Sequence, residues 1–566
     1  MSEDESTPTT VERLKAEGNV LHGQGSYQAA YQKYSEAIKE APANVVLAIL
    51  YANRAASCLA MKEYLDAFHD ANTAAELDPT YAKAWARVGT AAHALEIWDV
   101  CRKAWTSALA CLPTTDLTPT QLVLKAQFKA GVKAADAGEV KSTAVAKSKF
   151  MHFAEDSNAR GNMPWDRALV LAGQNQLARG ELPSSGFVIL NAHRDFIRGI
   201  KTMQQIKIKR KADGNLEVKA IPNALVDITN GLLRDSRVFH ADSRFFTQLE
   251  SQLRFEAEFT GAWSSGGPKK VQKEVVARQR KEGWLPVRRA LSVTVRAWMI
   301  RGFLDSQMGA RTSGVEFYLR ALDLLEWGRR TWPNVPAEDR GIIFEPSFVR
   351  GIRRLHLPAV MNLYLKQGAE SGYTLENIAQ MARDLIAETQ ASVRNPACLQ
   401  DPGFFASFWI YPVAEGLSIL GWYHMQLGLQ HFDKTGDIDL GEEAVVNFHQ
   451  SSRYYIQAAG KYPEDDEERP HMLAVALEAL WWGAAPLRVT LPLCRKIRAA
   501  MPKPVPIWEF SSKSLNKRNA NCAEAVRFLD DCERQLADGT ATLESALMPL
   551  DLMERRVGRV AQLRDD

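Results

Sequence analysis

Small and bulky apolar residues recur in the first part of the chain with a fixed period of about 34 residues. Small residues stand at the two positions where the helices of a hairpin must approach closely: Gly18, Ala55 and Gly89 at the first, and Ala37, Ala74 and Ala108 at the second. Bulky Tyr34 and Trp105 lie between them in the outer units, where the middle unit has Ala71. This pattern predicts three helix-turn-helix units, over about residues 11–44, 48–81 and 82–115.

Proline and capping signals mark where these helices begin and end. Each unit closes with a proline, which cannot continue a helix: Pro42, Pro79 and Pro113. A capping box over Thr9–Glu12 opens the first helix. A second such signature at Thr118 precedes an amphipathic run, which predicts a capping helix over 119–136 that covers the last apolar face. We therefore predict a self-contained repeat domain over residues 9–137, after a disordered polar tail of residues 1–8.

The pattern changes between residues 150 and 290, where short apolar runs alternate with turn signals. Residues 186–190, Gly-Phe-Val-Ile-Leu, are typical of a short buried strand or turn. Alternating apolar and basic residues flank Asp213-Gly214, a dipeptide that favours a tight β-hairpin. Four cations on this ribbon would suit phosphate, but edge strands also use lysine against aggregation, and we favour that role for Lys207, Lys209, Arg210 and Lys211. We predict an α+β domain over residues 150–290.

The remaining residues, 291–566, are predicted to form a helical domain. The repeat spacing recurs in degenerate form at Trp298, Gly302, Gly314, Tyr318 and Ala321. Further helix pairs are expected over 414–429 with 442–459 and over 472–482 with 487–500, followed by a last helix over 519–536. The predicted fold class is thus mostly α: a repeat array, a small α+β middle region with a β-hairpin, and a helical domain with degenerate helix-turn-helix repeats.

Composition and charge narrow the classes of function. The net charge of +3 gives no global field for nucleic acid, and the basic run 269–289 lacks the interleaved aromatics of a single-strand binder. No run of about 18 uninterrupted apolar residues suggests a membrane span. Seven cysteines without Cys-x-x-Cys spacing indicate reduced thiols, as in the cytoplasm or nucleus, and neither a metal nor a cofactor is expected.

Charged and amide side chains recur on the first helix of each unit. Lys83 and Arg87 are four residues apart, so they project from one face of a helix. Lys15 and Asn19 have the same spacing in the first unit, and Asn53 stands in the second. Ammonium, guanidinium and amide groups satisfy carboxylate oxygens through charge-assisted hydrogen bonds, so this set predicts an anion-binding groove. The alternative is that each side chain is simply solvated on an exposed face.

These motifs resemble the tetratricopeptide repeat (TPR) family over about residues 9–113, and within it the carboxylate-clamp subgroup. That subgroup has Lys-x-x-x-Asn in its first repeat, Asn in its second and Lys-x-x-x-Arg in its third, and this chain fills all five positions. The resemblance implies a co-chaperone whose groove holds the C-terminal Glu-Glu-Val-Asp tail of 70- or 90-kDa heat-shock chaperones. It further implies that the carboxylates of the last residue are held by Lys15, Asn19, Asn53 and Lys83, while Arg87 contacts the preceding segment.

A catalytic site is not evident in the sequence. The signatures of phosphate-binding loops, dinucleotide-binding turns, serine nucleophile elbows and zinc proteases are absent. His240 and Asp242 would in principle form a base and its orienter, but two residues so close on one element give no sign of that geometry. We therefore expect an adaptor or co-chaperone that also contacts a second, unidentified protein. Two alternatives stay open: an enzyme whose active site in residues 150–566 is localised by the repeats, and a general TPR scaffold.

Overall fold

The computed structural model shows a chain built mainly of helices. It describes residues 9–41, 45–157, 162–179, 182–210, 216–242, 244–393, 400–435, 441–509 and 513–565. The chain divides into two compact units, the first joining residues 1–152 with 253–345 and the second joining 153–252 with 346–566. The predicted domain boundaries differ from this division, because the stretch 150–290 is shared between the two units.

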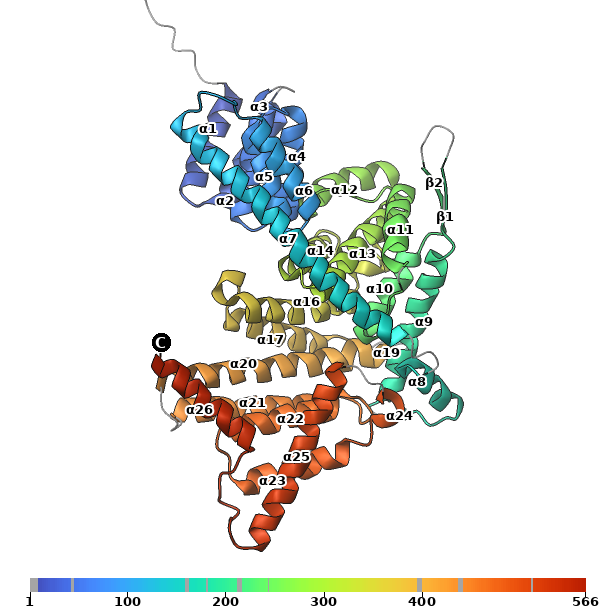
Figure 1. The fold of residues 1–566 in the computed structure, drawn as a ribbon. Helices are drawn as coiled ribbons and strands as arrows, with labels where there is room; N and C mark the ends of the chain where they lie inside the picture. The colour runs from blue at the N-terminus through green and yellow to red at the C-terminus, as the bar shows by residue number, and fades with distance from the viewer. Residues whose placement is uncertain are drawn as a thin grey trace, which may run out of the picture. The chain divides into compact units, whose positions relative to one another are not determined.

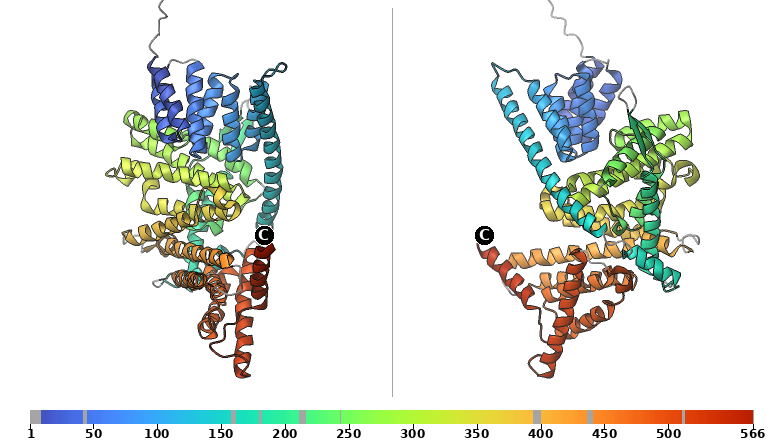
Figure 2. Two further views of the ribbon diagram at one scale, coloured as in Figure 1. Left: turned by 90° about the vertical axis from the view of Figure 1, so that its left-hand side faces the viewer. Right: turned by 45° about the vertical axis from the view of Figure 1, so that its right-hand side comes forward.

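The repeat array opens the first unit and is drawn in blue in Figure 1. Its six helices are α1 (Thr10–Gly23), α2 (Tyr27–Glu40), α3 (Val45–Ala60), α4 (Tyr64–Leu77), α5 (Ala82–Ala94) and α6 (Trp98–Ala110). They form three hairpins whose helices lie side by side in Figure 2. The capping helix is longer than predicted, since α7 extends over Pro119–Ser157. The predicted tail, residues 1–8, and Pro42 lie outside the described residues.

Matched small and bulky residues hold the hairpins together, as the repeat pattern predicts. A Cβ atom on Gly18 would lie 2.6 Å from the ring of Tyr34, and one on Gly89 would lie 2.6 Å from the ring of Trp105. Each glycine therefore allows an aromatic ring to fill the space between two helices. The middle repeat has alanine in place of the ring, and its hairpin belongs to a cluster of small and branched residues: Ala55, Ala71, Val88 and Ala104.

Helices from much later in the chain pack against the repeats. The first unit also contains α12 (Pro268–Glu282), α13 (Trp284–Met308), α14 (Arg311–Thr331), α15 (Ala337–Arg340) and the turn η2 (Ile342–Phe344), and α11 (Phe245–Thr260) leads into them. At the start of α4, Lys269 forms an ion pair with Glu63, and Glu316 accepts a hydrogen bond from the backbone N–H of Leu65 at 3.4 Å. The repeat array therefore shares its compact unit with helices from residues 253–345, and its independent folding stays a prediction.

Asp66 of α4 is buried in this contact. Its Oδ2 atom lies against Gly267 and has no hydrogen-bond partner within the described part of the chain. Burial, and then the nearby Glu63 carboxylate, raise the pKa of Asp66 to about 7, against the opposing charges of Arg320 and Lys269. This pKa is higher in the folded protein than in the unfolded chain, where it is about 3.9. The carboxyl group therefore favours folding most below about pH 4, and that contribution is lost as the pH rises through 7.

Replacing Asp66 by asparagine removes this ionisable group. We expect the stability advantage of Asp66→Asn over the wild type to grow by about 1–3 kcal/mol between about pH 5 and pH 8, because only the wild type must ionise a buried carboxyl. Thermal unfolding of both proteins across this range measures the advantage. Glu76→Gln, which changes an exposed carboxylate on the same helix, is the matched control. A pH response that is the same in both variants would contradict this role for Asp66.

The second unit contains the remaining elements. Its first part comprises α8 (Pro164–Gly173), α9 (Ser185–Met203), the strands β1 (Lys207–Arg210) and β2 (Leu216–Lys219), α10 (Ala224–Arg234) and the turn η1 (Ser236–Val238). Its second part comprises α16 (Pro346–Gln367), η3 (Gly368–Ser371), α17 (Leu375–Ala391), α19 (Pro402–Phe405), the π-helical turn η4 (Ala406–Ile410), α20 (Tyr411–Thr435), α21 (Glu442–Lys461), α22 (Glu468–Trp482), α23 (Leu487–Ala500), α24 (Val505–Trp508), α25 (Lys513–Ala537) and α26 (Leu550–Asp565). The large apolar core of this unit draws mainly on α20 to α23 and α25.

Two predictions for the middle region are wrong. Residues 186–190 lie inside α9 rather than in a strand, because Ser184 caps this helix by accepting a hydrogen bond from Gly186 N–H, and apolar residues then follow with helical spacing. The predicted α+β class for residues 150–290 is also wrong, since the described part is helical except for two paired strands of four residues each. Lys211, Asp213 and Gly214 lie outside the described residues, as do the side chains of Lys209 and Arg210.

One helical run is long and apolar enough to cross a membrane. It extends over Pro402–Lys434, and its most apolar window has a mean hydropathy of 1.3. However, 72% of this window is buried inside the protein, as in a core helix. The run is therefore only weak support for a membrane span.

Candidate functional site

The five predicted groove residues lie on three neighbouring helices, one from each repeat. Lys15 and Asn19 belong to α1, Asn53 to α3, and Lys83 and Arg87 to α5. Because α3 contacts both α1 and α5, the three helices form one continuous surface. We call this surface the groove face.

The two asparagines of the groove face are in direct contact. The side-chain N–H of Asn53 donates to Oδ1 of Asn19 at 3.1 Å, and the hydroxyl of Tyr34 donates to the same oxygen at 2.9 Å. With its oxygen occupied twice, the Asn19 amide keeps its NH₂ group for an outside acceptor. Asn53 retains its second N–H for the same purpose. The hydrogen bonds thus orient two amide donors before any ligand binds.

The two lysines are the accessible cations of the groove face. Lys83 is exposed and Lys15 is half-buried, and neither forms a salt bridge with another described residue. Lys83 lies in the first turn of α5, a turn without an acidic residue. The positive end of the helix dipole therefore adds to the charge of the Lys83 ammonium group. An anion that binds here displaces no existing ion pair.

The Arg87 guanidinium is largely shielded from solvent. Its Nη1 atom is buried and has no hydrogen-bond partner among the residues that the structure describes. Burial lowers the pKa of Arg87, while a side-chain contact with Tyr81 opposes this effect. A buried N–H donor without an acceptor costs about 1–3 kcal/mol, so a carbonyl or carboxylate oxygen from a ligand would be favourable at this place.

Two further groove residues are missed by the sequence analysis. His22 follows Asn19 by three residues on α1, and Ser57 follows Asn53 by four on α3, so each lies one helical turn further along the groove face. Nδ1 of His22 is 3.1 Å from the hydroxyl oxygen of Ser57. The helical spacing of these residues from the two asparagines is the signal that could have identified them.

The structure does not bring His240 and Asp242 together as a catalytic pair. Nδ1 of His240 is 2.9 Å from the carbonyl oxygen of Val238, and its ring stacks on Trp165 with centroids 5.0 Å apart. Asp242 is instead paired with Arg244 at 3.3 Å. Among the described residues, no group of three or more histidine, cysteine or acidic side chains is arranged to hold a metal ion.

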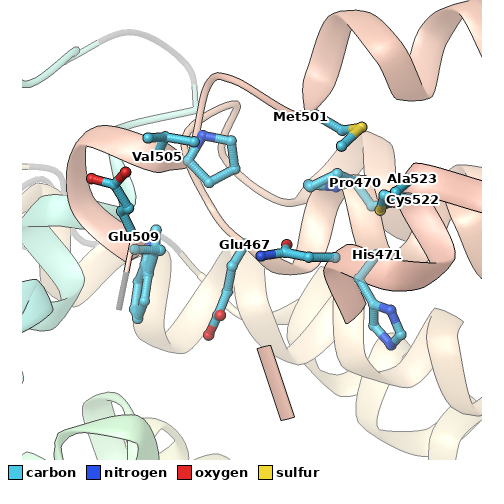
Figure 3. Close-up of a pocket in the computed structure, with 11 residues that line it drawn as sticks. Glu467, Pro470, His471, Met501, Val505, Glu509, Cys522 and Ala523 are labelled. Carbon is cyan, nitrogen blue, oxygen red and sulfur yellow. Dashed lines mark hydrogen bonds between the residues drawn. The ribbon is translucent and has the colours of Figure 1, made fainter. Parts of the chain in front are cut away.

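A separate cavity of about 300 Å³ lies in the second unit (Figure 3). Its lining includes Pro470, Met501, Pro504, Val505 and Trp508. The ring of Trp508 is held by the Arg237 guanidinium, 3.9 Å from its centroid, and that arginine also pairs with Glu467. Burial raises the pKa of the lining thiol, Cys522, to about 11, so it stays protonated near neutral pH. The cavity therefore offers apolar space but no activated nucleophile.

Known proteins resemble this chain over lengths similar to that of the repeat array. No protein-family model matches the chain. It is 42% identical over 92 residues to the small glutamine-rich tetratricopeptide repeat-containing protein 2 of Saccharomyces cerevisiae, a match that covers 16% of this chain and 26% of that protein. The chain thus resembles TPR proteins. Two further relatives are the heat shock protein sti1 homolog of Schizosaccharomyces pombe, 38% identical over 99 residues, and the Hsp70-Hsp90 organizing protein of Triticum aestivum, 36% identical over 106 residues.

The similarity of this chain to its relatives is limited in extent. These two matches cover 18% and 19% of this chain, and 16% and 18% of the relatives. The chain therefore spans about a quarter or less of the length of the curated relatives that it matches. The aligned lengths are similar to that of the repeat array, so the comparisons bear on a TPR domain rather than on the whole protein.

Proposed function

We propose that this TPR protein is an adaptor whose groove face binds the C-terminal Glu-Glu-Val-Asp tail of 70- or 90-kDa heat-shock chaperones. The observation that carries the proposal is the pair of oriented amides, Asn19 and Asn53, flanked by cations that have no salt-bridge partner among the described residues. The names of the relatives agree with it, since one of them is an Hsp70-Hsp90 organizing protein.

A chain that ends in aspartate presents two carboxylates close together. In the proposed complex these groups accept hydrogen bonds from Lys15, Asn19, Asn53 and Lys83, and Arg87 contacts the segment just before them. A hydrogen bond to a charged group contributes about 1.5–3 kcal/mol, but a short flexible peptide must be ordered when it binds. We therefore expect a dissociation constant on the order of micromolar.

The remainder of the chain is proposed to contact a second protein, which would make the molecule an adaptor between a chaperone and its client. We further propose that it acts in the cytoplasm or nucleus. The cysteines of the described residues are free thiols, which is consistent with a reducing compartment. An enzymatic role has less support. His240 stacks on Trp165, and the cavity near Trp508 is lined by Cys522 and His471, but burial raises the pKa of that thiol to about 11.

The free terminal carboxylate distinguishes a clamp from a general peptide scaffold. We expect a free-acid peptide ending in Glu-Glu-Val-Asp to bind the full chain at least about tenfold more tightly than the same peptide with an amidated C-terminus, because amidation removes a charged acceptor. Isothermal titration calorimetry with both peptides measures the difference. Equal affinities would show that the groove face binds internal segments and is not a carboxylate clamp.

A further inference from the structure

His22 occupies a built polar environment next to the clamp residues. Its ring packs edge-on against Tyr27 of α2, with centroids 5.1 Å apart, and its Nδ1 is 3.1 Å from the Ser57 hydroxyl oxygen on α3. Ser57 itself is completely buried. Contacts from two other helices therefore fix the position of the imidazole, which is only partly buried and remains partly accessible.

The charges around His22 are unbalanced. Its pKa is lowered first by burial and then by the positive charge of Arg87 on α5. Its ring packs on the phenol of Tyr27, the phenol of Tyr34 lies near Arg87, and none of the described carboxylates raises the pKa of His22. Arg87 also has a buried N–H without an acceptor in the part of the chain that the structure describes. An anionic group of a ligand would therefore be favourable beside His22 and Arg87.

We propose that Arg87 and His22, which the buried Ser57 holds in position, form a second subsite that binds an acidic side chain upstream of the ligand's terminal carboxylate. The subsite rests on the proposed function, since it extends the same groove face by one helical turn. It would make the protein prefer tails with a glutamate at the matching position. Arg87 supplies the permanent charge of the subsite, and His22 supplies an N–H donor that becomes a cation when it is protonated.

Binding at this subsite is linked to protonation. A carboxylate beside His22 raises the pKa of the imidazole, so the complex takes up a proton that the free protein does not hold at neutral pH. The affinity should therefore increase about three- to tenfold as the pH falls from about 7.5 to 6, a range in which glutamate and aspartate of the peptide stay ionised. Without His22, this increase should disappear.

The test is a double-mutant cycle on the full chain by calorimetry. The probes are the free-acid peptide ending in Glu-Glu-Val-Asp and two variants in which one glutamate at a time is replaced by glutamine. We expect one of these replacements to weaken binding to the wild type about five- to tenfold at pH 6, and to have little effect on His22→Gln. His93→Gln is the control, because His93 is an exposed histidine of the array whose ring packs on Trp98, with centroids 5.2 Å apart, rather than on the second-subsite residues.

The outcomes separate this inference from the proposed function. One outcome refutes the second subsite and leaves the clamp standing. In it, the free-acid peptide binds more tightly than the amide, but each glutamine replacement changes the affinity for the wild type and for His22→Gln by the same factor. If no free-acid peptide binds at any pH, both proposals fail. Ser57→Ala provides a second variant: weaker binding of the glutamate peptide with an unchanged thermal unfolding temperature supports the subsite, and unchanged affinity speaks against it.

Discussion

Replacing Lys83 by alanine should weaken binding of a free-acid Glu-Glu-Val-Asp peptide by about 10- to 100-fold. A hydrogen bond to a charged group contributes about 1.5–3 kcal/mol, and its loss leaves a carboxylate oxygen poorly satisfied. Lys83 also lies at the positive end of α5, and the other residues of that turn, Ala82, Ala84 and Trp85, carry no charge that could replace it. The side chain is exposed, and its removal should leave the unfolding temperature unchanged.

Calorimetry measures this loss, and two further variants calibrate it. Lys103→Ala removes the same charge from an exposed position on α6, outside the groove face, and should bind the peptide like the wild type. Arg87→Ala should weaken binding less than Lys83→Ala, because we place Arg87 beside the upstream segment rather than the terminal residue. Added salt should lower the affinity of the wild type and have a smaller effect on Lys83→Ala. Wild-type affinity in Lys83→Ala would exclude the clamp.

The repeat array was largely predictable because its determinants are local. Helix hairpins with a fixed period place small residues such as Gly18 and Gly89 against rings from the same repeat, within about 16 residues along the chain. The five groove positions follow from the same register, because residues at equal places in each repeat must lie on equivalent helices. Their mutual contact through Asn19 and Asn53 then requires only that α1 and α3 are neighbours.

The errors and omissions have non-local causes. The contact of α12 and α14 with α4 joins residues about 200 to 250 positions apart, such as Lys269 with Glu63, and no pattern within either segment signals it. The short strand or turn predicted over 186–190 rested on apolar side chains, which a buried helix has as well. In the structure, the cap at Ser184 decides between the two. His22 was overlooked because its helical spacing from Asn19 becomes informative only when Ser57 and Arg87 are known to lie next to it.

The stability of the array depends on a charge pair buried in the middle repeat. Nε and Nη2 of Arg54 donate to the two carboxylate oxygens of Asp70, each at 2.7 Å, so the pair is bidentate. Nη1 donates to the Ser35 hydroxyl at 3.0 Å, and the guanidinium lies 5.1 Å from the ring centroid of Tyr31. Asp70 is only 3% exposed. This one arginine thus joins α2, α3 and α4.

Replacing Arg54 by alanine should destabilise the array by about 3–5 kcal/mol, because Asp70 is left as an uncompensated buried charge. Replacing both residues by apolar ones, in Arg54→Met with Asp70→Leu, should recover most of the loss, since the desolvation penalty disappears together with the pair. Hydrogen exchange of peptides from α3 and α4 in the full chain is the suitable measurement, because two compact units need not unfold in one step. Lys39→Ala, which removes a cation from the end of α2, should leave exchange in α3 and α4 unchanged. If Arg54→Ala exchanges like the wild type, the array is held by its small-against-bulky packing alone, and the buried pair adds nothing measurable to its stability.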